Sequence, residues 1–477
     1  MAGMVKRRAH FWRSFVAVFV VLFLSGCQGN RAPVNLPKSN PTADVDGLVK
    51  LPEKNVWTYV RDRGDVFGAI PHGGTVEGGT FYQGGPGILE LDMQTGKKIL
   101  DVKWPPEHKV YCGEAPIVWQ NRLYDTITEF DTQTASANQT VEWLACLDAA
   151  TGSILWKSDV IGADVALGGN PLLLAGKLYC PAYLPDIIDS TEPEPDFPSA
   201  VDIFDAKTGQ LTGRIPLPHG SYPEATQLVS DGASVYGSAF YDVSWGHCRS
   251  SIFRYDPSTD KTVWSVNYPV LPNDLINATY ALAVDNGTLI VVSRVEESSY
   301  YADGTTTDLK PEYHMAAAFD TADGHELWSK SGLISSDTHL KSDQKPEIAT
   351  RDGLAFLSIQ DDGSLVALDE RTGEEKWSFT VEKSRIESGP SIDGTPFYWY
   401  YNLIPMATAN LLYVREGDSA LLAVDPDTGT ELWRKTLLTD YEMFEARDTI
   451  SDAIPVSGGI LVITCSWGGV RTLKLWQ

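Results

Sequence analysis

Seven copies of one short phrase divide most of the chain into units of similar length. Each copy is an apolar run followed by an aspartate and a turn, which contains Thr-Gly in five copies, as in ALDERTGEEKW from Ala367 and AVDPDTGTELW from Ala423. A repeat of this kind predicts an array of similar structural units rather than two or three unrelated domains. The leading aspartates lie 49 to 64 residues apart and are Asp92, Asp148, Asp205, Asp256, Asp320, Asp369 and Asp425.

Each position of the phrase has a mechanical reason. The aspartate can accept hydrogen bonds from backbone N–H groups in a turn, and the glycine four residues later permits a positive φ. Asp260 replaces that glycine in the fourth copy. A tryptophan follows the aspartate by eight residues in five copies, whereas Leu100 and Gly213 stand there in the first and third. A large ring at a fixed strand position predicts packing between neighbouring sheets.

A second phrase precedes each copy and consists of an apolar strand, a turn and another apolar strand, as in YALAVDNGTLIVV from Tyr280. Two hairpins per unit give four short antiparallel strands, which is the size of a propeller blade. The eighth unit lacks its outer strand, and residues 55–60 form an unpaired strand before the first hairpin. We therefore predict an all-β fold, an eight-bladed β-propeller of four-stranded antiparallel blades whose last blade is closed by an N-terminal strand.

The N-terminus has the features of an export signal. A basic segment precedes a ten-residue apolar run from Phe15 to Leu24, which is too short to span a membrane. Leu24-Ser25-Gly26-Cys27 follows and resembles the lipobox of bacterial lipoproteins, which predicts lipid attachment at Cys27. We expect residues 1–26 to be a lipoprotein signal peptide, residues 27–50 a flexible tether and residues 51–477 a single propeller.

The net charge, the cysteines and the absence of known motifs limit the kinds of partner and of functional site that we expect. The 477 residues carry a formal net charge of −25, which disfavours nucleic acid as a partner. Five further cysteines are widely spaced and none is adjacent to another, so buried free thiols are expected, with one disulfide left open. We find no sequence pattern for a catalytic site, a metal site or a cofactor site, and we expect a monomeric non-enzyme.

The long connections are expected on one face of the ring, because turns within hairpins alternate with connections between them. These inserts are 128–142, 183–200, 241–249, 295–313 and 383–402. Function often resides on such loops, and aromatic side chains there can anchor a partner. The candidate partner-face residues are Asp186, Asp189, Glu192, Glu194, Tyr300, Tyr301, Tyr398, Trp399 and Tyr400. Packing of the aromatic residues on the rim and solvation of the acidic ones are the alternatives.

The repeat resembles the quinoprotein-type, or pyrroloquinoline quinone-like, repeat over about residues 55–476. Blade count and lipobox together are similar to the propeller lipoproteins of the outer-membrane β-barrel assembly machinery. This resemblance implies a lipid-anchored scaffold for envelope proteins, on the outer membrane or on the outer face of a single cell membrane. A sensor or adhesion module that binds another protein or a glycan is the alternative. A quinone-dependent dehydrogenase is less favoured, because the family's adjacent cysteines are absent from this sequence.

Overall fold

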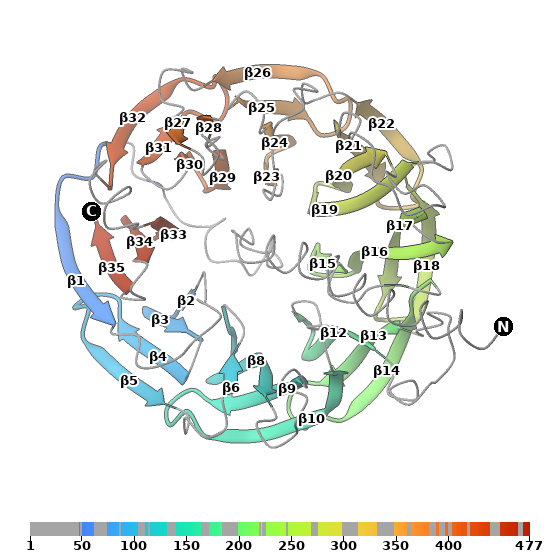
Figure 1. The fold of residues 1–477 in the computed structure, drawn as a ribbon, viewed down its shortest axis with the longest axis horizontal. Coiled ribbons are helices and arrows are strands. Elements are labelled where there is room, and N and C mark those ends of the chain that lie inside the picture. Colours follow the sequence, from blue (N-terminus) through green and yellow to red (C-terminus); the bar gives the residue numbers. More distant parts are fainter. Residues whose placement is uncertain are drawn as a thin grey trace.

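The chain forms a closed ring of eight four-stranded antiparallel sheets in a computed structural model (Figure 1). The model describes part of the chain, and everything below concerns that part. The described residues are 47, 50–61, 74–84, 87–103, 110–112, 115–130, 140–163, 171–183, 199–218, 221, 226–244, 247–268, 275–297, 313–331, 348–359, 364–380, 388–390, 396–398, 403–416, 420–438, 449–465 and 471–477.

The first four blades follow one another along the chain. Blade 1 has β2 (Thr75–Glu77), β3 (Thr80–Gln83), β4 (Gly87–Asp92) and β5 (Lys98–Lys103). Blade 2 has β6 (Val110–Cys112), β7 (Ile117–Trp119), β8 (Arg122–Phe130), β9 (Thr140–Asp148) and β10 (Ile154–Ala163). Blade 3 has β11 (Leu172–Leu174), β12 (Lys177–Tyr183), β13 (Ser199–Asp205) and β14 (Leu211–Pro216). Blade 4 has β15 (Gln227–Ser230), β16 (Val235–Ser244), β17 (His247–Asp256) and β18 (Lys261–Asn267).

The remaining blades complete the ring. Blade 5 has β19 (Leu275–Asp285), β20 (Thr288–Glu297), β21 (Tyr313–Asp320) and β22 (Glu326–Ser331). Blade 6 has β23 (Ile348–Arg351), β24 (Leu354–Ile359), β25 (Ser364–Asp369) and β26 (Glu375–Thr380), and a small sheet of β27 (Ser388–Pro390) and β28 (Pro396–Tyr398) follows it. Blade 7 has β29 (Leu403–Ala407), β30 (Leu412–Glu416), β31 (Ala420–Val424) and β32 (Glu431–Thr436). Blade 8 has β33 (Thr449–Val456), β34 (Gly459–Cys465), β35 (Arg471–Trp476) and β1 (Asn55–Arg61).

Blade 8 is closed by strands from opposite ends of the chain. β1 pairs antiparallel with β35, from Asn55 opposite Trp476 to Arg61 opposite Arg471. The backbones of Lys54 and Gln477 exchange two further hydrogen bonds beyond the strands, at 3.2 and 3.0 Å. The expected closure by an N-terminal strand is therefore confirmed. Closure leaves no blade with a missing partner strand, which removes an edge that would invite aggregation.

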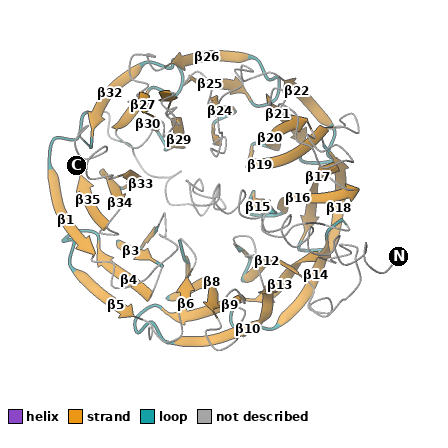
Figure 2. Ribbon diagram, in the orientation of Figure 1, coloured by secondary structure: helices purple, strands orange, loops and turns teal. Residues whose placement is uncertain are grey.

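The burial of the strands explains their patterns of apolar and polar residues. Inner strands are covered on both faces by neighbouring blades, and every residue of β31, with the sequence ALLAV, is buried. Outer strands alternate, and in β26, with the sequence EKWSFT, Trp377 is buried while the residues beside it are exposed. The core is consequently divided among the contacts between blades, called seams here and numbered by the two blades that meet. All regular structure among the described residues is strand (Figure 2).

Two faces of the ring follow from this topology. The turn joining the first two strands of a blade lies beside its Thr-Gly turn, because backbone hydrogen bonds join them, such as Glu370 N–H to the Gly353 carbonyl at 2.9 Å. The side carrying both kinds of turn is called the turn face, and the opposite side the loop face.

Two of the expected long inserts extend strands, and the inner strand of blade 2 is divided. Within residues 241–249, β16 extends to Ser244 and β17 begins at His247, and these two residues pair, so the described part of this insert is strand. β8 and β9 extend similarly into residues 128–142. The inner strand of blade 2 is divided into β6 and β7, which both pair with β8. Polar residues dominate these extensions, so the apolar alternation that marks a strand in sequence is missing.

Candidate interaction surfaces

The repeat aspartates lie in the turns between the third and fourth strands and are bound there. The Asp92 carboxylate accepts hydrogen bonds from the Thr95 N–H at 2.7 Å and the Thr95 hydroxyl at 2.6 Å. These bonds hold the pKa of Asp92 below its usual value, and the bond from the Thr95 hydroxyl contributes most. The Asp205 carboxylate binds Thr208 in the same way. The carboxylates therefore stabilise turns, and the seven turn residues are Asp92, Asp148, Asp205, Asp256, Asp320, Asp369 and Asp425.

Five tryptophans on outer strands join their blade to the turn of the next blade. The Trp377 indole N–H donates a hydrogen bond of 2.8 Å to the carbonyl of Pro426, the residue after Asp425. The ring also covers the turn glycine, because a Cβ built on Gly429 would lie 2.6 Å from the ring. Trp57, Trp156, Trp264 and Trp328 make the same pair of contacts with the next blade. We call this arrangement the Trp–Gly lock.

Seam 3–4 shows the two partners of the lock changed together. Gly213 stands where the tryptophan is expected, and Asp260 stands at the glycine position with a φ of 56°. The Asp260 carboxylate accepts a hydrogen bond from the Tyr255 hydroxyl and lies 3.8 Å from the Cβ position of Gly213. A side chain at the glycine position is accommodated where the indole ring is absent.

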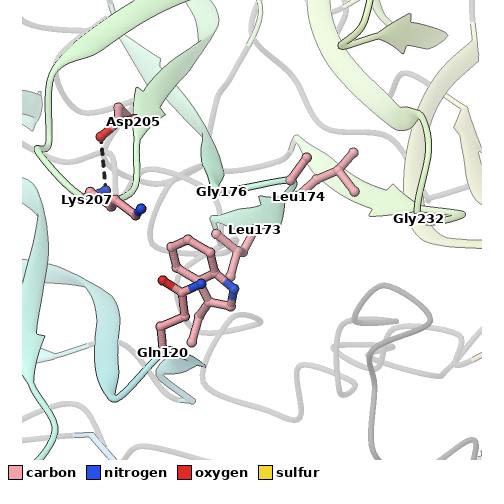
Figure 3. A pocket seen from close by; sticks show the side chains of 9 residues that line it. Gln120, Leu173, Leu174, Gly176, Asp205, Lys207 and Gly232 are labelled. Carbon is pink, nitrogen blue, oxygen red and sulfur yellow. Dashed lines mark hydrogen bonds between the residues drawn. The ribbon is translucent and has the colours of Figure 1, made fainter.

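A hollow of about 590 Å³ lies on the turn face (Figure 3). Its wall comes from blade 2 at Trp119 and Gln120, from blade 3 at residues 173–176, 205 and 207, and from blade 4 at Gly232. The backbone of Gln120 has a φ of 50°, as its position in the β7–β8 turn requires. The volume is within the range of small-ligand sites.

The chemistry of this hollow is mixed. Leu173 and Leu174 provide an apolar wall, and Leu174 is only 7% exposed. The Asp205 carboxylate accepts the Lys207 N–H at 3.1 Å, as the dashed line in Figure 3 shows. Arg122 donates to the Lys207 carbonyl at 2.9 Å, which fixes this turn against blade 2. The hollow thus combines an aliphatic wall with the polar turn that carries Asp205 and Lys207.

The partner-face residues expected from the sequence lie mainly outside the described part of the chain. Tyr398 is the last residue of β28. The other eight lie outside the described residues, and so does Cys27; they are Asp186, Asp189, Glu192, Glu194, Tyr300, Tyr301, Trp399 and Tyr400. Their role therefore stays a prediction.

Two of the cysteines have the state that their strand pattern suggests. Cys146 and Cys180 are buried free thiols. Burial raises the pKa of the Cys146 thiol, which makes it a poor nucleophile at neutral pH. Within the described residues, no group of three or more His, Cys, Asp and Glu side chains is placed to hold a metal ion. In the same part of the chain, no helix is long and apolar enough to span a bilayer.

Known proteins resemble this chain in repeat and in fold. Residues 314–475 match the family model of outer membrane protein assembly factor BamB. This match, over blades 6 to 8 and the end of blade 5, confirms the resemblance to the quinoprotein-type propellers. No curated protein matches the chain.

Solved structures extend the similarity of fold to most of the ring. The quinohemoprotein alcohol dehydrogenase from Comamonas testosteroni is 15% identical with a TM-score of 0.50, and the match covers 89% of this chain and 76% of that one. BamB from Moraxella catarrhalis is 14% identical with a TM-score of 0.49, and the match covers 88% of this chain and 99% of that one. At 15% identity and a TM-score of 0.50, the likeness to the dehydrogenase shows the propeller fold alone.

One notable residue was not singled out from the sequence. Glu90 is 3% exposed, although it lies in an otherwise apolar strand of blade 1. Burial, and secondarily the charge of Asp148, raises its pKa to about 7. The available signal was its position two residues before the repeat aspartate, where Ala318, Ala367 and Ala423 stand in other copies.

Proposed function

We propose that this chain is a lipid-anchored propeller scaffold of the bacterial cell envelope that binds other proteins and catalyses no reaction. The observation that carries the proposal is the match of residues 314–475 to a family described as an outer membrane assembly factor. The turn carboxylates, the most regular acidic groups of the ring, are engaged in structural hydrogen bonds, which agrees with a structural role.

The anchor in this proposal is Cys27, with residues 1–26 removed and residues 27–50 acting as a tether. Two contacts near the start of the ring support a path for such a tether. Gly47 contacts Asn410 in the β29–β30 turn of blade 7, and Pro52 accepts a hydrogen bond of 2.7 Å from the Lys435 ammonium. Because Gly47 lies beside a turn of the turn face, we propose that the tether meets the ring on that side and that the loop face points away from the anchor.

Partner binding is proposed for the loop face, through the acidic segment from Asp186 to Glu194 and the aromatic residues Tyr300, Tyr301 and Tyr398. Aromatic side chains on loops are effective anchors, because they bury large areas with little loss of conformational freedom. The hollow on the turn face is the second surface where a partner side chain would fit.

In-cell photocrosslinking tests both surfaces. A photoreactive residue is placed at Tyr300 on the loop side, at Gln120 beside the hollow, or at Lys376 on the exposed outer strand of blade 6 as the matched control. We expect a defined envelope protein to be captured from Tyr300 and not from Lys376. Capture of an outer-membrane barrel insertase supports assembly of barrel proteins, and capture of other envelope proteins or glycan supports the sensor or adhesion role.

An enzymatic role has its own test, because a quinohemoprotein dehydrogenase shares the fold. Purified protein is supplied with pyrroloquinoline quinone, calcium and an alcohol, together with an artificial electron acceptor. We expect no turnover above the rate of free quinone. Turnover that saturates with alcohol would replace the scaffold by a dehydrogenase.

A further inference from the structure

Seam 1–2 lacks the Trp–Gly lock. Leu100 occupies the tryptophan position, so no indole N–H is offered to the carbonyl of Ala149, the residue after Asp148. The turn glycine of blade 2, Gly152, is covered by Val102 instead, because a Cβ there would lie 2.4 Å from a Val102 methyl group. Seam 1–2 therefore lacks the indole hydrogen bond that the Trp–Gly lock provides at five other seams.

A carboxyl group lies at this position. Glu90 is directly opposite Leu100 in the pairing of β4 with β5. Its side chain is 3% exposed, and its Oε1 atom is buried without a hydrogen-bond partner among the described residues. A buried carboxylate without hydrogen bonds is strongly unfavourable, whereas a neutral carboxyl group is tolerated at much lower free energy.

Among the described residues, the neighbours of Glu90 on β3, β8 and β9 supply no compensating cation. Tyr82 lies opposite it on β3, and Asp148 ends β9 in blade 2. Asp125 on β8 is also buried and, by strand alternation with Leu123, faces the same seam.

Charged groups on the outer strands face elsewhere. The ammonium of Lys157 on β10 lies 3.9 Å above the ring of Trp143, and the Lys157 side chain is exposed. Asp101 on β5 faces the opposite seam, where its carboxylate lies 3.7 Å from the Arg61 guanidinium. In the part of the chain that the structure describes, these groups near the Glu90 carboxyl are thus neutral or acidic.

We propose that seam 1–2 is a pH-sensitive junction of the ring, closed while the Glu90 carboxyl is neutral and loosened when it ionises. This inference is independent of the proposed function, because it concerns the seam and no partner. Ionisation places a charge among Ile88, Leu123 and other apolar residues of the seam, and adds repulsion from Asp148. Water entry between the two blades relieves both effects.

The direction of the effect follows from the pKa. Burial raises the pKa of Glu90 from 4.5 to about 7 in the closed seam, so the closed form holds a proton that an open, solvated form releases. The neutral Glu90 carboxyl stabilises the closed seam fully below pH 4.5. This stabilisation declines between pH 4.5 and about 7 and is lost above that range. Full ionisation raises the opening equilibrium constant by about 300-fold, and by about 70-fold between about pH 5 and about pH 8.

Amide hydrogen exchange of the full-length protein in detergent measures this opening. Exchange is compared at about pH 5 and about pH 8 as protection factors, which remove the intrinsic pH dependence of the chemistry. We expect protection in β4 and β8 to fall by up to about 70-fold with rising pH, while β25 and β31 of blades 6 and 7 change little. Glu90→Gln keeps the shape without the charge and should abolish the fall, and Glu77→Gln, an exposed glutamate of blade 1, is the matched control that should retain it.

Three results would overturn the proposal. The first is equal loss of protection in all seams of the wild-type protein, because the effect is then global. The second is unchanged protection of β4 and β8 across the pH range. The third is a Glu90→Gln variant with the pH response of the wild type. The first two need no variant, so the test stands even if Glu90→Gln fails to fold.

Discussion

The Trp–Gly lock predicts that two substitutions in neighbouring blades compensate each other. Gly429 has a φ of 71°, and a Cβ on it would lie 2.6, 2.7 and 3.0 Å from three ring atoms of Trp377. Gly429→Ala therefore adds about 1 kcal/mol of left-handed backbone strain and about 1–3 kcal/mol of overpacking. Trp377→Ala removes a buried ring and a hydrogen bond and should destabilise by about 3–5 kcal/mol.

The double variant should lose less unfolding free energy than the sum of the losses in the two single variants. In the Trp377→Ala background, Gly429→Ala meets no ring and retains only the strain of about 1 kcal/mol. The expected coupling free energy is therefore about 1–3 kcal/mol. Seam 3–4 supports this reasoning, because Asp260 is accommodated at the glycine position where Gly213 has replaced the tryptophan.

Equilibrium unfolding in urea of the four proteins gives this coupling. Gly353→Ala is the matched control, since Gly353 has a φ of 85° and a Cβ there has no atom within 4 Å. It should lower the unfolding free energy by about 1 kcal/mol in either background. Additivity of Gly429→Ala and Trp377→Ala within about 0.5 kcal/mol would refute the lock as a steric contact.

Three further predictions follow from the ends and from the thiols. Deletion of residues 51–60 removes the strand that pairs with β35 and should lower the melting temperature sharply, so an unchanged transition in circular dichroism would contradict ring closure. Cys27→Ser should move the protein from the membrane to the soluble fraction on cell fractionation; continued sedimentation with membranes would exclude this anchor. Cys146 and Cys180 should resist a maleimide in the native protein and react in urea, and fast native labelling by mass spectrometry would contradict their burial.

The fold could be predicted because its information is local and repeated. Seven blades carry their hairpins and a repeat turn led by aspartate within one unit, and the orphan strand at residues 55–60 left only one place for closure. The strand extensions through residues 241–249 were missed, because hydrogen bonds of the backbone form there without an apolar pattern.

The candidate surfaces were harder to predict for the opposite reason. The hollow is formed by turns of three blades, from Trp119 to Gly232, so no single segment of the sequence predicts it. The burial of Glu90 depends on a leucine ten residues later and on the next blade, so its environment is a property of the seam. Sequence reasoning finds elements more readily than the spaces between them.

Ring closure also fixes the order in which this protein can mature. A chain that is synthesised from the N-terminus delivers β1 first and its partner β35 after every other strand of the ring. Until then the half-buried Val56, Trp57 and Tyr59 have no final binding place. Chaperones and proteases therefore have the whole period of synthesis to act on this strand, and its pairing marks the end of that period.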